Sequence, residues 1–365
     1  MARCLFVVSD ELWTGRARAL VAGACGLAAR DHAVVVMADV SSAAFSQLRR
    51  GGTGENPKPQ ALPPRMRRGG TSRVRALRRE IRGHEPDVIF VHNDADHLAV
   101  ALALMGLSRK PSIVRRVAVG ERVRPTRVGR IAERLALPIH LLTGRQGIDR
   151  ADIASPRFRV ELGVTVPKTE TTPSQAPLLV CAYDPRATNH ASRVLRAVTM
   201  LRKRHRHLTL CMVATNEVPE RLRMQAAALG LSRVVRWLRT PAGTDEVLAQ
   251  AWALVVAVGG DEALYATLDS MAHGVPLVAP RSALFERYVA NGISGILLDS
   301  FDAPACAAAL ATLVSDTDRR DAMGGVARAR VARDYPETEY VEGLEVLLRS
   351  VVANRATGEP FAGVA

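Results

Sequence analysis

Two carboxylates stand eight residues apart in the segment DEALYATLDSMAHGVPLVAP, and together they could hold the two ends of an elongated ligand. A helix that begins at Asp261 would place Asp269 two turns further along, about 12 Å away. Gly259 and Gly260 precede this helix and would let a ligand approach the backbone, whose unpaired N–H groups at the helix start suit a phosphate. The spacing fits a nucleotide-sugar with its diphosphate between the carboxylates. A simpler alternative makes Asp261 a helix cap and Asp269 a solvated residue.

These residues need a frame of buried strands, and the sequence around them predicts one. In the second half, apolar runs such as LLVCAY and ALVVAV alternate with helical stretches, as in a doubly wound parallel sheet. The first half shows the same alternation from CLFVV to PIHLLTG, interrupted at residues 51–70 by a Gly-, Pro- and Arg-rich segment that is expected to form a loop. A Pro- and Thr-rich linker at 162–178 separates the halves. The expected parts are an N-terminal domain (1–170), a C-terminal domain (171–345), and a helix end and tail (346–365).

Composition agrees with two globular domains and narrows the function. The chain has 365 residues, 48% of them hydrophobic, and its five cysteines lack the CxxC spacing of a zinc site and are expected to be reduced core residues. No apolar run approaches the roughly 18 residues that span a bilayer. The sequence also lacks a GxGxxG after its first strand, the P-loop GxxxxGK[ST], HExxH and GxSxG. Nicotinamide dehydrogenases, P-loop enzymes, zinc proteases and serine hydrolases of these types are therefore disfavoured.

Residues 230–300 resemble the C-terminal domain of the family 4 glycosyltransferases, which have the GT-B fold. That family carries an acid, seven residues, a second acid and then Ala-Met-Ala-x-Gly-x-Pro-Val-Val. This chain has Asp261, seven residues, Asp269 and then Ser-Met-Ala-His-Gly-Val-Pro-Leu-Val. The segment GHEPDVIFVHNDADHLAVALAL is more weakly similar to the family's acceptor domain. The resemblance implies an α/β GT-B fold, in which two Rossmann-like, doubly wound domains face a central cleft, the first for the acceptor and the second for the nucleotide-sugar.

The resemblance also implies roles for single residues on the donor side. In the family the first acid lies against the donor sugar and the second holds the nucleotide ribose. Asp261 would therefore be the catalytic residue and Asp269 a donor-binding residue, each one methylene shorter than the usual Glu. Glu286 resembles the Glu of the family's following Glu-Val-Val segment and would also bind the donor, beside Gly259 and Gly260 at the helix start.

Two departures concern the groups that would stabilise the leaving diphosphate. The family places an Arg and a Lys after the first strand of its second domain, where this chain has Asp184 and Asn189. Arg186 is the nearby cation and is predicted to replace them in donor binding. The family's His after the strand PSIVRRVAV is replaced by Val or Ala. Since loss of one such group costs about 3 kcal/mol of transition-state stabilisation, two interpretations stay open: an active enzyme, and a binding or scaffold protein that has lost turnover.

On the acceptor side, the motif HNDADH and the first loop carry the candidates. His92 ends a predicted strand and is expected to contact the acceptor, with a purely structural role or a metal cluster in this motif as the alternatives. Gly15 follows the first strand where the family carries a Gly-rich loop, although a plain turn glycine would look the same. The implied reaction is retaining transfer of a hexose from a nucleotide-diphosphate sugar, in polysaccharide biosynthesis, without metal or cofactor. In such a reaction the leaving phosphate itself would assist deprotonation of the acceptor.

The positive charge of the chain, +14 overall, is concentrated in the first half. Residues 1–172 hold 29 Lys/Arg and 16 Asp/Glu, whereas residues 173–365 hold 21 and 20. A basic acceptor domain suits an anionic membrane and a lipid-linked acceptor, so we expect a cytoplasmic protein that is peripheral on the inner face of the membrane; a solvated basic face with a soluble acceptor is the alternative. Nucleic acid is not an expected partner, because aromatic content is only 4% and no binding module is recognisable. The predicted basic helix TSRVRALRREIRG supplies Arg73, Arg75, Arg79 and Arg82.

Overall fold

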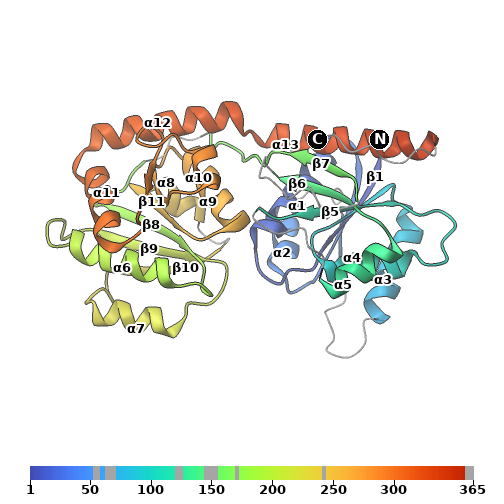
Figure 1. Cartoon of the computed structure of the whole chain (residues 1–365), viewed down its shortest axis with the longest axis horizontal. Coiled ribbons are helices and arrows are strands. Elements are labelled where there is room, and N and C mark those ends of the chain that lie inside the picture. The colour runs from blue at the N-terminus through green and yellow to red at the C-terminus, as the bar shows by residue number, and fades with distance from the viewer. Residues whose placement is uncertain are drawn as a thin grey trace. The chain divides into compact units, whose positions relative to one another are not determined.

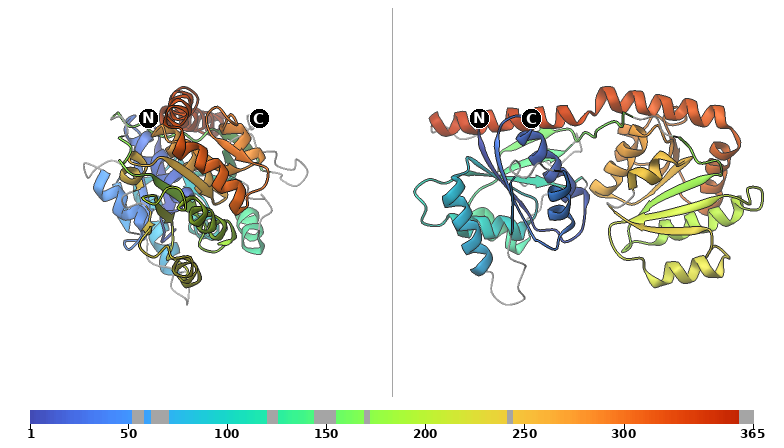
Figure 2. Two further views of the ribbon diagram at one scale, coloured as in Figure 1. Left: turned by 90° about the vertical axis from the view of Figure 1, so that its left-hand side faces the viewer. Right: turned by 180° about the vertical axis from the view of Figure 1, so that it is seen from behind.

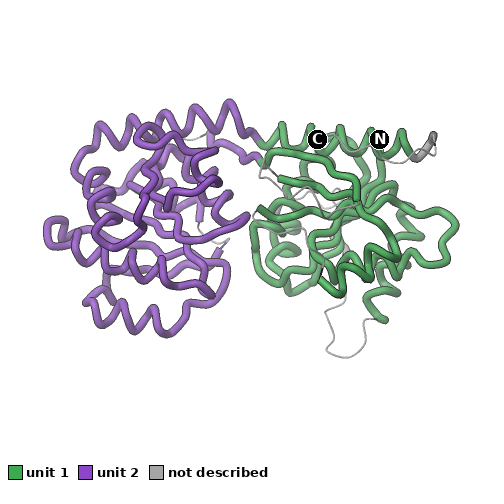
Figure 3. The backbone as a smooth tube through the Cα atoms, in the orientation of Figure 1, with its two compact units in different colours: residues 1–162, 337–365 green, residues 163–336 purple. Residues whose placement is uncertain are grey.

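The computed structural model of the chain divides into two compact units, each with its own parallel sheet (Figure 3). Unit 1 consists of Met1–Leu162 and Glu337–Ala365, and unit 2 of Gly163–Pro336. These bounds differ from the expected boundaries at 170 and 345, the second of which falls inside the last helix. The structure describes residues 1–51, 58–61, 71–119, 126–143, 155–168, 172–240 and 244–357.

Unit 1 is a seven-stranded sheet of order β3-β2-β1-β4-β5-β6-β7, in which every neighbouring pair is parallel. Helices cover both faces of this sheet (Figures 1 and 2), which explains why its central strands are continuous apolar runs. Its strands are β1 Arg3–Val8, β2 Ala33–Ala38, β3 Lys58–Ala61, β4 Val88–Val91, β5 Ser112–Val117, β6 Ile139–Thr143 and β7 Arg157–Val160. Its helices are α1 Gly15–Ala28, α2 Ala43–Gly51, α3 Thr71–His84, α4 Asp94–Leu104, α5 Arg127–Leu135 and α13 Glu337–Thr357.

The two edges of this sheet correct the sequence-based expectation. Residues 51–70 were expected to form one loop, yet β3 lies within them and pairs with β2, Lys58 beside Val35. An edge strand tolerates Pro59 because one side of its backbone needs no ladder partner. The other edge strand, β7, is not predicted by the sequence pattern because its four residues, RFRV, include two arginines and form no apolar run. The rest of the segment 51–70, apart from Gly51 itself, lies outside the described residues.

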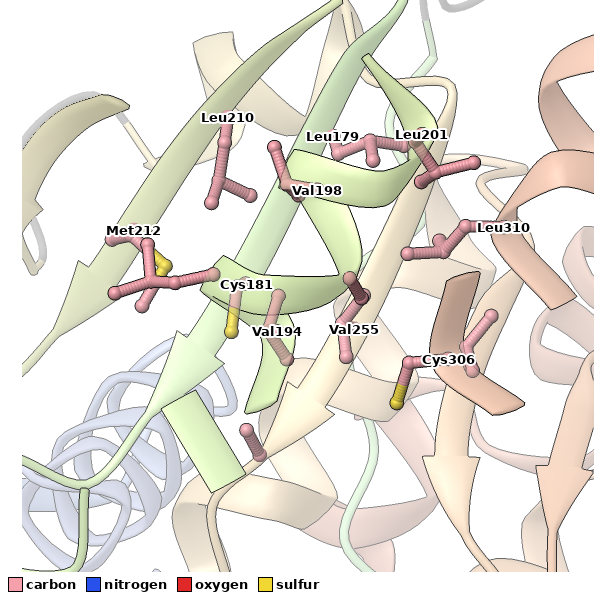
Figure 4. Close-up of a cluster of buried hydrophobic side chains, with 14 of the residues drawn as sticks. Leu179, Cys181, Val194, Val198, Leu201, Leu210, Met212, Val255, Cys306 and Leu310 are labelled. Atoms are coloured by element: carbon pink, nitrogen blue, oxygen red, sulfur yellow. The ribbon is translucent and has the colours of Figure 1, made fainter. Parts of the chain in front are cut away.

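Unit 2 is a six-stranded parallel sheet of order β10-β9-β8-β11-β12-β13. Figure 4 shows part of its core, where side chains of three strands meet α6 and α11. The labelled residues are Leu179, Cys181, Leu210, Met212 and Val255 of the strands, Val194, Val198 and Leu201 of α6, and Cys306 and Leu310 of α11. The strands are β8 Leu178–Tyr183, β9 Thr209–Ala214, β10 Val235–Arg239, β11 Ala253–Ala257, β12 Leu277–Pro280 and β13 Ile296–Leu298. The helices are α6 Asn189–Leu201, α7 Glu220–Ala228, α8 Thr244–Ala249, α9 Gly260–Ala272, α10 Ala283–Tyr288, α11 Ala303–Ser315 and α12 Thr317–Asp334.

The last helix, α13, is an integral part of unit 1 although it is far from that unit in sequence. The Tyr340 hydroxyl donates a hydrogen bond to the Ala19 carbonyl of α1 at 3.1 Å. A Cβ at Gly26 would lie 2.2 Å from Val341, so only glycine lets α1 and α13 pack this closely. Arg30, just after the end of α1, also forms ion pairs with two glutamates of α13, Glu342 and Glu345.

In both sheets the strand order reverses at one point, and this feature positions the candidate site. Unit 1 reverses between β1 and β4, and unit 2 between β8 and β11. Ligands of doubly wound sheets bind at the carboxyl ends of the strands beside such a reversal. The predicted pair of Rossmann-like domains is therefore confirmed. Of the five cysteines expected in the core, Cys25 is exposed. None of the described helices combines the length and apolarity that crossing a bilayer requires.

Candidate functional site

The turn from β11 into α9 leaves open space at the reversal point of unit 2. Gly259 caps α9 without a side-chain hydrogen bond, and Gly260 follows with a φ of +67°, a left-handed conformation that favours glycine. A Cβ added at Gly259 would meet nothing within 4 Å. The first N–H groups of α9 therefore lie beside an accessible backbone, the arrangement that was expected for a bound phosphate.

Asp261 and Asp269 are both buried in α9, with 1% and 8% of their surface exposed. The alternative of a helix cap and a solvated residue is therefore wrong, because Gly259 holds the cap position and Asp269 is covered. The helix ends as expected at Gly274, whose φ is +66°, with the Val275 N–H bonded to the Ser270 carbonyl at 2.8 Å. Neither carboxylate therefore lies on a solvated face of the helix.

A second helix starts at the same edge of the sheet. Strands β8 and β11 are parallel neighbours, with Tyr183 beside Ala257, so the turn into α6 lies next to the turn into α9. Thr188 caps α6 without a side-chain hydrogen bond, and the first turn of α6 holds no acid. Helix N-termini carry partial positive charge, so two of them at one edge form a suitable place for an anion.

Arg186 lies in the turn between β8 and α6, as predicted, but its charge already has a partner. Its backbone N–H donates to the Asp184 carboxylate at 2.8 Å, and its Nε lies 3.4 Å from the same oxygen. The Arg186 side chain is 87% exposed, so it is free to rotate away from this carboxylate. Asn189 is the first residue of α6. The structure thus places all three residues at the reversal point, with Arg186 as the cation among them.

Glu286 lies one strand further along, on α10 after β12. It is half-exposed and accepts a hydrogen bond from Arg281 at 3.3 Å. Arg281 follows the end of β12 and also donates to Asp299 at 2.5 Å. These hydrogen bonds raise the pKa of Arg281 above its usual value. Sequence reasoning missed this cation, although its place directly after an apolar strand was a usable signal.

In unit 1 a polar cluster occupies the reversal point between β1 and β4. His92 Nε2 lies 3.0 Å from Asp10 Oδ1, and the Asn93 amide lies 3.2 Å from the same nitrogen. Asp96 accepts from the Ser9 hydroxyl at 2.7 Å and from Asn93 at 2.7 Å, and it pairs with Arg73. We refer to these six residues as the Asp10 cluster: Ser9, Asp10, Arg73, His92, Asn93 and Asp96.

In the hydrogen-bonded pair of Asp10 and His92, Asp10 is the more accessible side chain, although the sequence analysis did not select it. The His92 side chain is only 1% exposed, whereas that of Asp10 is 24% exposed. Burial raises the pKa of Asp10, but the hydrogen bond and charge of His92, with help from Thr14 and Arg16, outweigh it and lower the pKa to about 2. Asp10 is therefore ionised at neutral pH. Its position directly after the first apolar strand was the available signal.

Gly15 is the first residue of α1 and is buried. It follows Asp10 closely in the sequence. The preceding Thr14 caps the helix by accepting from the Ala17 N–H at 3.2 Å, and its hydroxyl donates to Asp10 at 2.6 Å. The turn at Gly15 and the strand end at His92 therefore converge on one carboxylate. Whether Gly15 itself meets an acceptor stays a prediction.

Two family models match the sequence over regions that contain these sites. Residues 178–316 match the model described as glycosyl transferases group 1, and residues 14–116 match glycosyltransferase family 4. The chain belongs to the family 4-type glycosyltransferases. The expected resemblance is thereby confirmed, and α9, with both of its carboxylates, falls inside the first match.

Relatives and solved structures that resemble the chain agree with its fold. A D-inositol 3-phosphate glycosyltransferase of Corynebacterium urealyticum is 38% identical over 138 residues, which are 37% of this chain and 32% of the relative. The chain spans about a third of the length of the curated relatives it matches first. Two crystal structures superpose on nearly all of it, each with a TM-score of 0.73. One is a glycosyltransferase of Rickettsia africae, 14% identical over 96% of this chain and 98% of that one. The other is Anabaena Alr3699/HepE with UDP-glucose, 16% identical over 96% and 100%. The fold is GT-B.

The two histidines of the motif HNDADH do not meet at one site. His92 faces Asp10, whereas His97 Nε2 lies 2.8 Å from the Ala136 carbonyl after α5. Among the residues that the structure describes, no group of three or more His, Cys, Asp or Glu is placed to hold a metal ion. After β5, where the family carries a His, the chain continues with Ala118 and Val119, as the sequence comparison indicated.

Proposed function

We propose that this protein transfers a hexose from a nucleotide-diphosphate sugar to a hydroxyl acceptor. The observation that carries the proposal is the pair of helix starts at the reversal point of unit 2, each without a side-chain cap, together with the two buried carboxylates of α9. The N–H groups at such helix starts bind phosphate oxygens. Because α6 has no acid in its first turn, the diphosphate would lie nearer to α6 than to Asp261.

The two carboxylates of α9 would then bind the two ends of the donor. Asp261, at the start of the helix, accepts hydrogen bonds from hydroxyls of the sugar and acts at the reacting centre. Asp269, about two turns further along, accepts from the ribose hydroxyls. Charge-assisted hydrogen bonds of this kind are stronger than neutral ones and give orientation as well as affinity.

On the acceptor side we propose that the ionised Asp10 receives the acceptor hydroxyl, while His92 holds Asp10 in position. A carboxylate with a pKa of about 2 is a poor base, so it orients the hydroxyl instead of removing its proton. The leaving phosphate would take the proton on the same face, with retention of configuration and without a metal. The name of the Corynebacterium relative makes an inositol phosphate one acceptor to assay, and a lipid-linked sugar at an anionic membrane is another.

A second candidate function is nucleotide-sugar binding without turnover. The hydrogen bonds from Arg186 to Asp184 favour it, because they leave the diphosphate without a committed cation in the turn after β8. In this candidate the donor still binds at α6 and α9, but the charge that develops on the leaving group is not stabilised.

Release of nucleotide diphosphate from UDP-, GDP- and ADP-sugars, with and without acceptors, separates the candidates. An active enzyme gives acceptor-dependent release that falls by about a hundredfold in Asp261→Asn, while donor affinity changes less. The configuration of the product at its anomeric carbon, measured by NMR, tests retention. Donor binding without release supports the binding protein. Absence of both binding and release with every donor would overturn the proposal.

A further inference from the structure

Helix α5 (Arg127–Leu135) turns its smallest side chains toward the protein. Gly129 and Ala132 are its buried residues. A Cβ at Gly129 would lie 2.7 Å from the Asp94 carboxylate, so only glycine fits there. Surface helices normally bury their large apolar residues, because that burial is what holds them on the core. In α5 the inner face is too closely packed to accept any of them.

The large apolar residues of α5 lie on its outer side. Val128, Ile131 and Leu135 are 41%, 51% and 42% exposed. Their spacing of three and four residues puts them on one stripe of the helix, which we call the apolar stripe. Leu137, just after the helix, is also exposed. Single exposed apolar residues are ordinary, but a continuous stripe of them indicates a surface that is covered by a partner.

Three arginines run beside the apolar stripe, at Arg127, Arg130 and Arg134, and all are exposed. At 100° per residue they occupy the arc of the helix directly next to the stripe. The outer face of α5 is thus half apolar and half cationic. A helix of this kind lies in a membrane interface, with the apolar side chains among the acyl chains and the arginines among anionic headgroups.

Other occupants fit this face less well. A second copy of the chain would bring two rows of three arginines together, and like charges across an interface are repelled. A nucleic-acid backbone would pair with the arginines, but it would leave the aliphatic stripe in water and find no aromatic ring on α5 for stacking. Of these three partners, an anionic lipid surface is the one that both pairs with the arginines of α5 and covers its apolar stripe.

We propose that α5 is a membrane-docking helix, which seats unit 1 on anionic lipid through Val128, Ile131 and Leu135. This inference does not depend on sugar transfer, because docking can be measured without donor or acceptor. It also relocates the basic surface expected from the sequence. Of the arginines of α3, Arg73 is buried against Asp96 and Arg78 donates to the Met105 carbonyl. The exposed arginines that remain on α3 are Arg75, Arg79 and Arg82.

Flotation of the full chain with vesicles of equimolar phosphatidylglycerol and phosphatidylcholine tests the proposal. The wild type should float with these vesicles and should remain unbound with phosphatidylcholine alone or at high salt. Val128→Ser, Ile131→Ser and Leu135→Ser together should lower the partition coefficient at least about tenfold. Arg127→Gln, Arg130→Gln and Arg134→Gln should each lower the partition coefficient about fivefold. A matched control replaces three exposed apolar residues outside unit 1 by Ser and should bind as the wild type does: Met200, Met224 and Val326.

A second measurement keeps the test decisive if the triple variant folds poorly. Ile131→Trp should give tryptophan fluorescence that brominated phosphatidylglycerol quenches, whereas Met224→Trp should not. Equal flotation of wild type and the folded stripe variant would overturn the proposal, and so would an unquenched Trp at 131. Dimers that depend on the apolar stripe, in the absence of vesicle binding, would overturn it in favour of a second copy of this chain.

Discussion

A buried histidine in unit 1 should make the protein acid-sensitive in a predictable window. His140 on β6 is fully buried, and within the described part of the chain neither of its ring nitrogens has a hydrogen-bond partner. Burial, followed by the charge of Arg115, which is its register partner on β5, lowers the pKa of His140 from 6.5 to about 3. His97 and Arg157 act in the same direction, and Asp94 opposes them.

The sign and size of the effect follow from proton linkage. Between about pH 6.5 and pH 3 the unfolded chain binds a proton at this histidine that the folded chain does not bind, so the free energy of unfolding falls as the pH falls. With these pKa values, the loss between about pH 7.5 and pH 5 is about 2 kcal/mol. Asp10, whose pKa is lowered to about 2, loses its stabilising contribution only below about pH 5, outside the range between these two pH values. Glu133, 3.8 Å from the ring, has a pKa raised by burial and changes stability in the opposite direction.

Urea unfolding at the two pH values measures this difference. Of the three tryptophans only Trp13 belongs to unit 1, so Trp237→Phe and Trp252→Phe make fluorescence report that unit alone. In this background the free energy of unfolding falls between about pH 7.5 and pH 5, and His140→Leu should make that fall smaller by about 2 kcal/mol. Equal losses in the parent and in His140→Leu would refute the assignment of the acid sensitivity to His140.

Two further predictions concern the donor-binding unit. Arg186→Ala should lower kcat about ten- to a hundredfold with little change in acceptor KM, because a cation that stabilises the leaving diphosphate acts in the transition state; unchanged kcat would remove Arg186 from the reaction. Gly324→Ala in α12 should destabilise unit 2 by about 1–3 kcal/mol, since its Cβ would lie 2.0 Å from the Gly274 carbonyl oxygen. The neighbouring Gly325→Ala meets nothing within 4 Å and should be neutral or stabilising by up to about 1 kcal/mol, so similar thermal shifts in both variants would contradict this packing argument.

Much of the fold could be predicted because apolar periodicity reports burial on both faces of a sheet. CLFVV, ALVVAV and their equivalents became β1, β11 and the other central strands. The edge strands β3 and β7 were missed because each has only four residues without an apolar run, and because an edge position lets β3 contain Pro59. The pairing that makes such segments strands comes from a neighbour distant in sequence.

The candidate site could be predicted on the donor side, where the signal is local. The spacing of Asp261 and Asp269 within one helix placed both carboxylates before any tertiary contact was known. The Asp10 cluster was predicted only in part, because it joins two residues that lie more than eighty positions apart, Asp10 and His92. Helical spacing alone also left Arg73 on the basic face of α3, whereas its ion pair with Asp96 across to α4 buries it.

The central claim is that the edge of unit 2 at β8 and β11 binds a nucleotide-diphosphate sugar, and Asp269 offers the most direct test. Titration calorimetry with UDP and GDP should identify the nucleotide that binds the wild type. Asp269→Asn should weaken its binding by about 1.5–3 kcal/mol, because a buried carboxylate that accepts from ribose hydroxyls loses its charge-assisted hydrogen bonds. Asp245→Asn, the same change at an exposed position of α8, should leave the affinity unchanged. Equal affinities of wild type and Asp269→Asn for a nucleotide that clearly binds would contradict the proposed donor site.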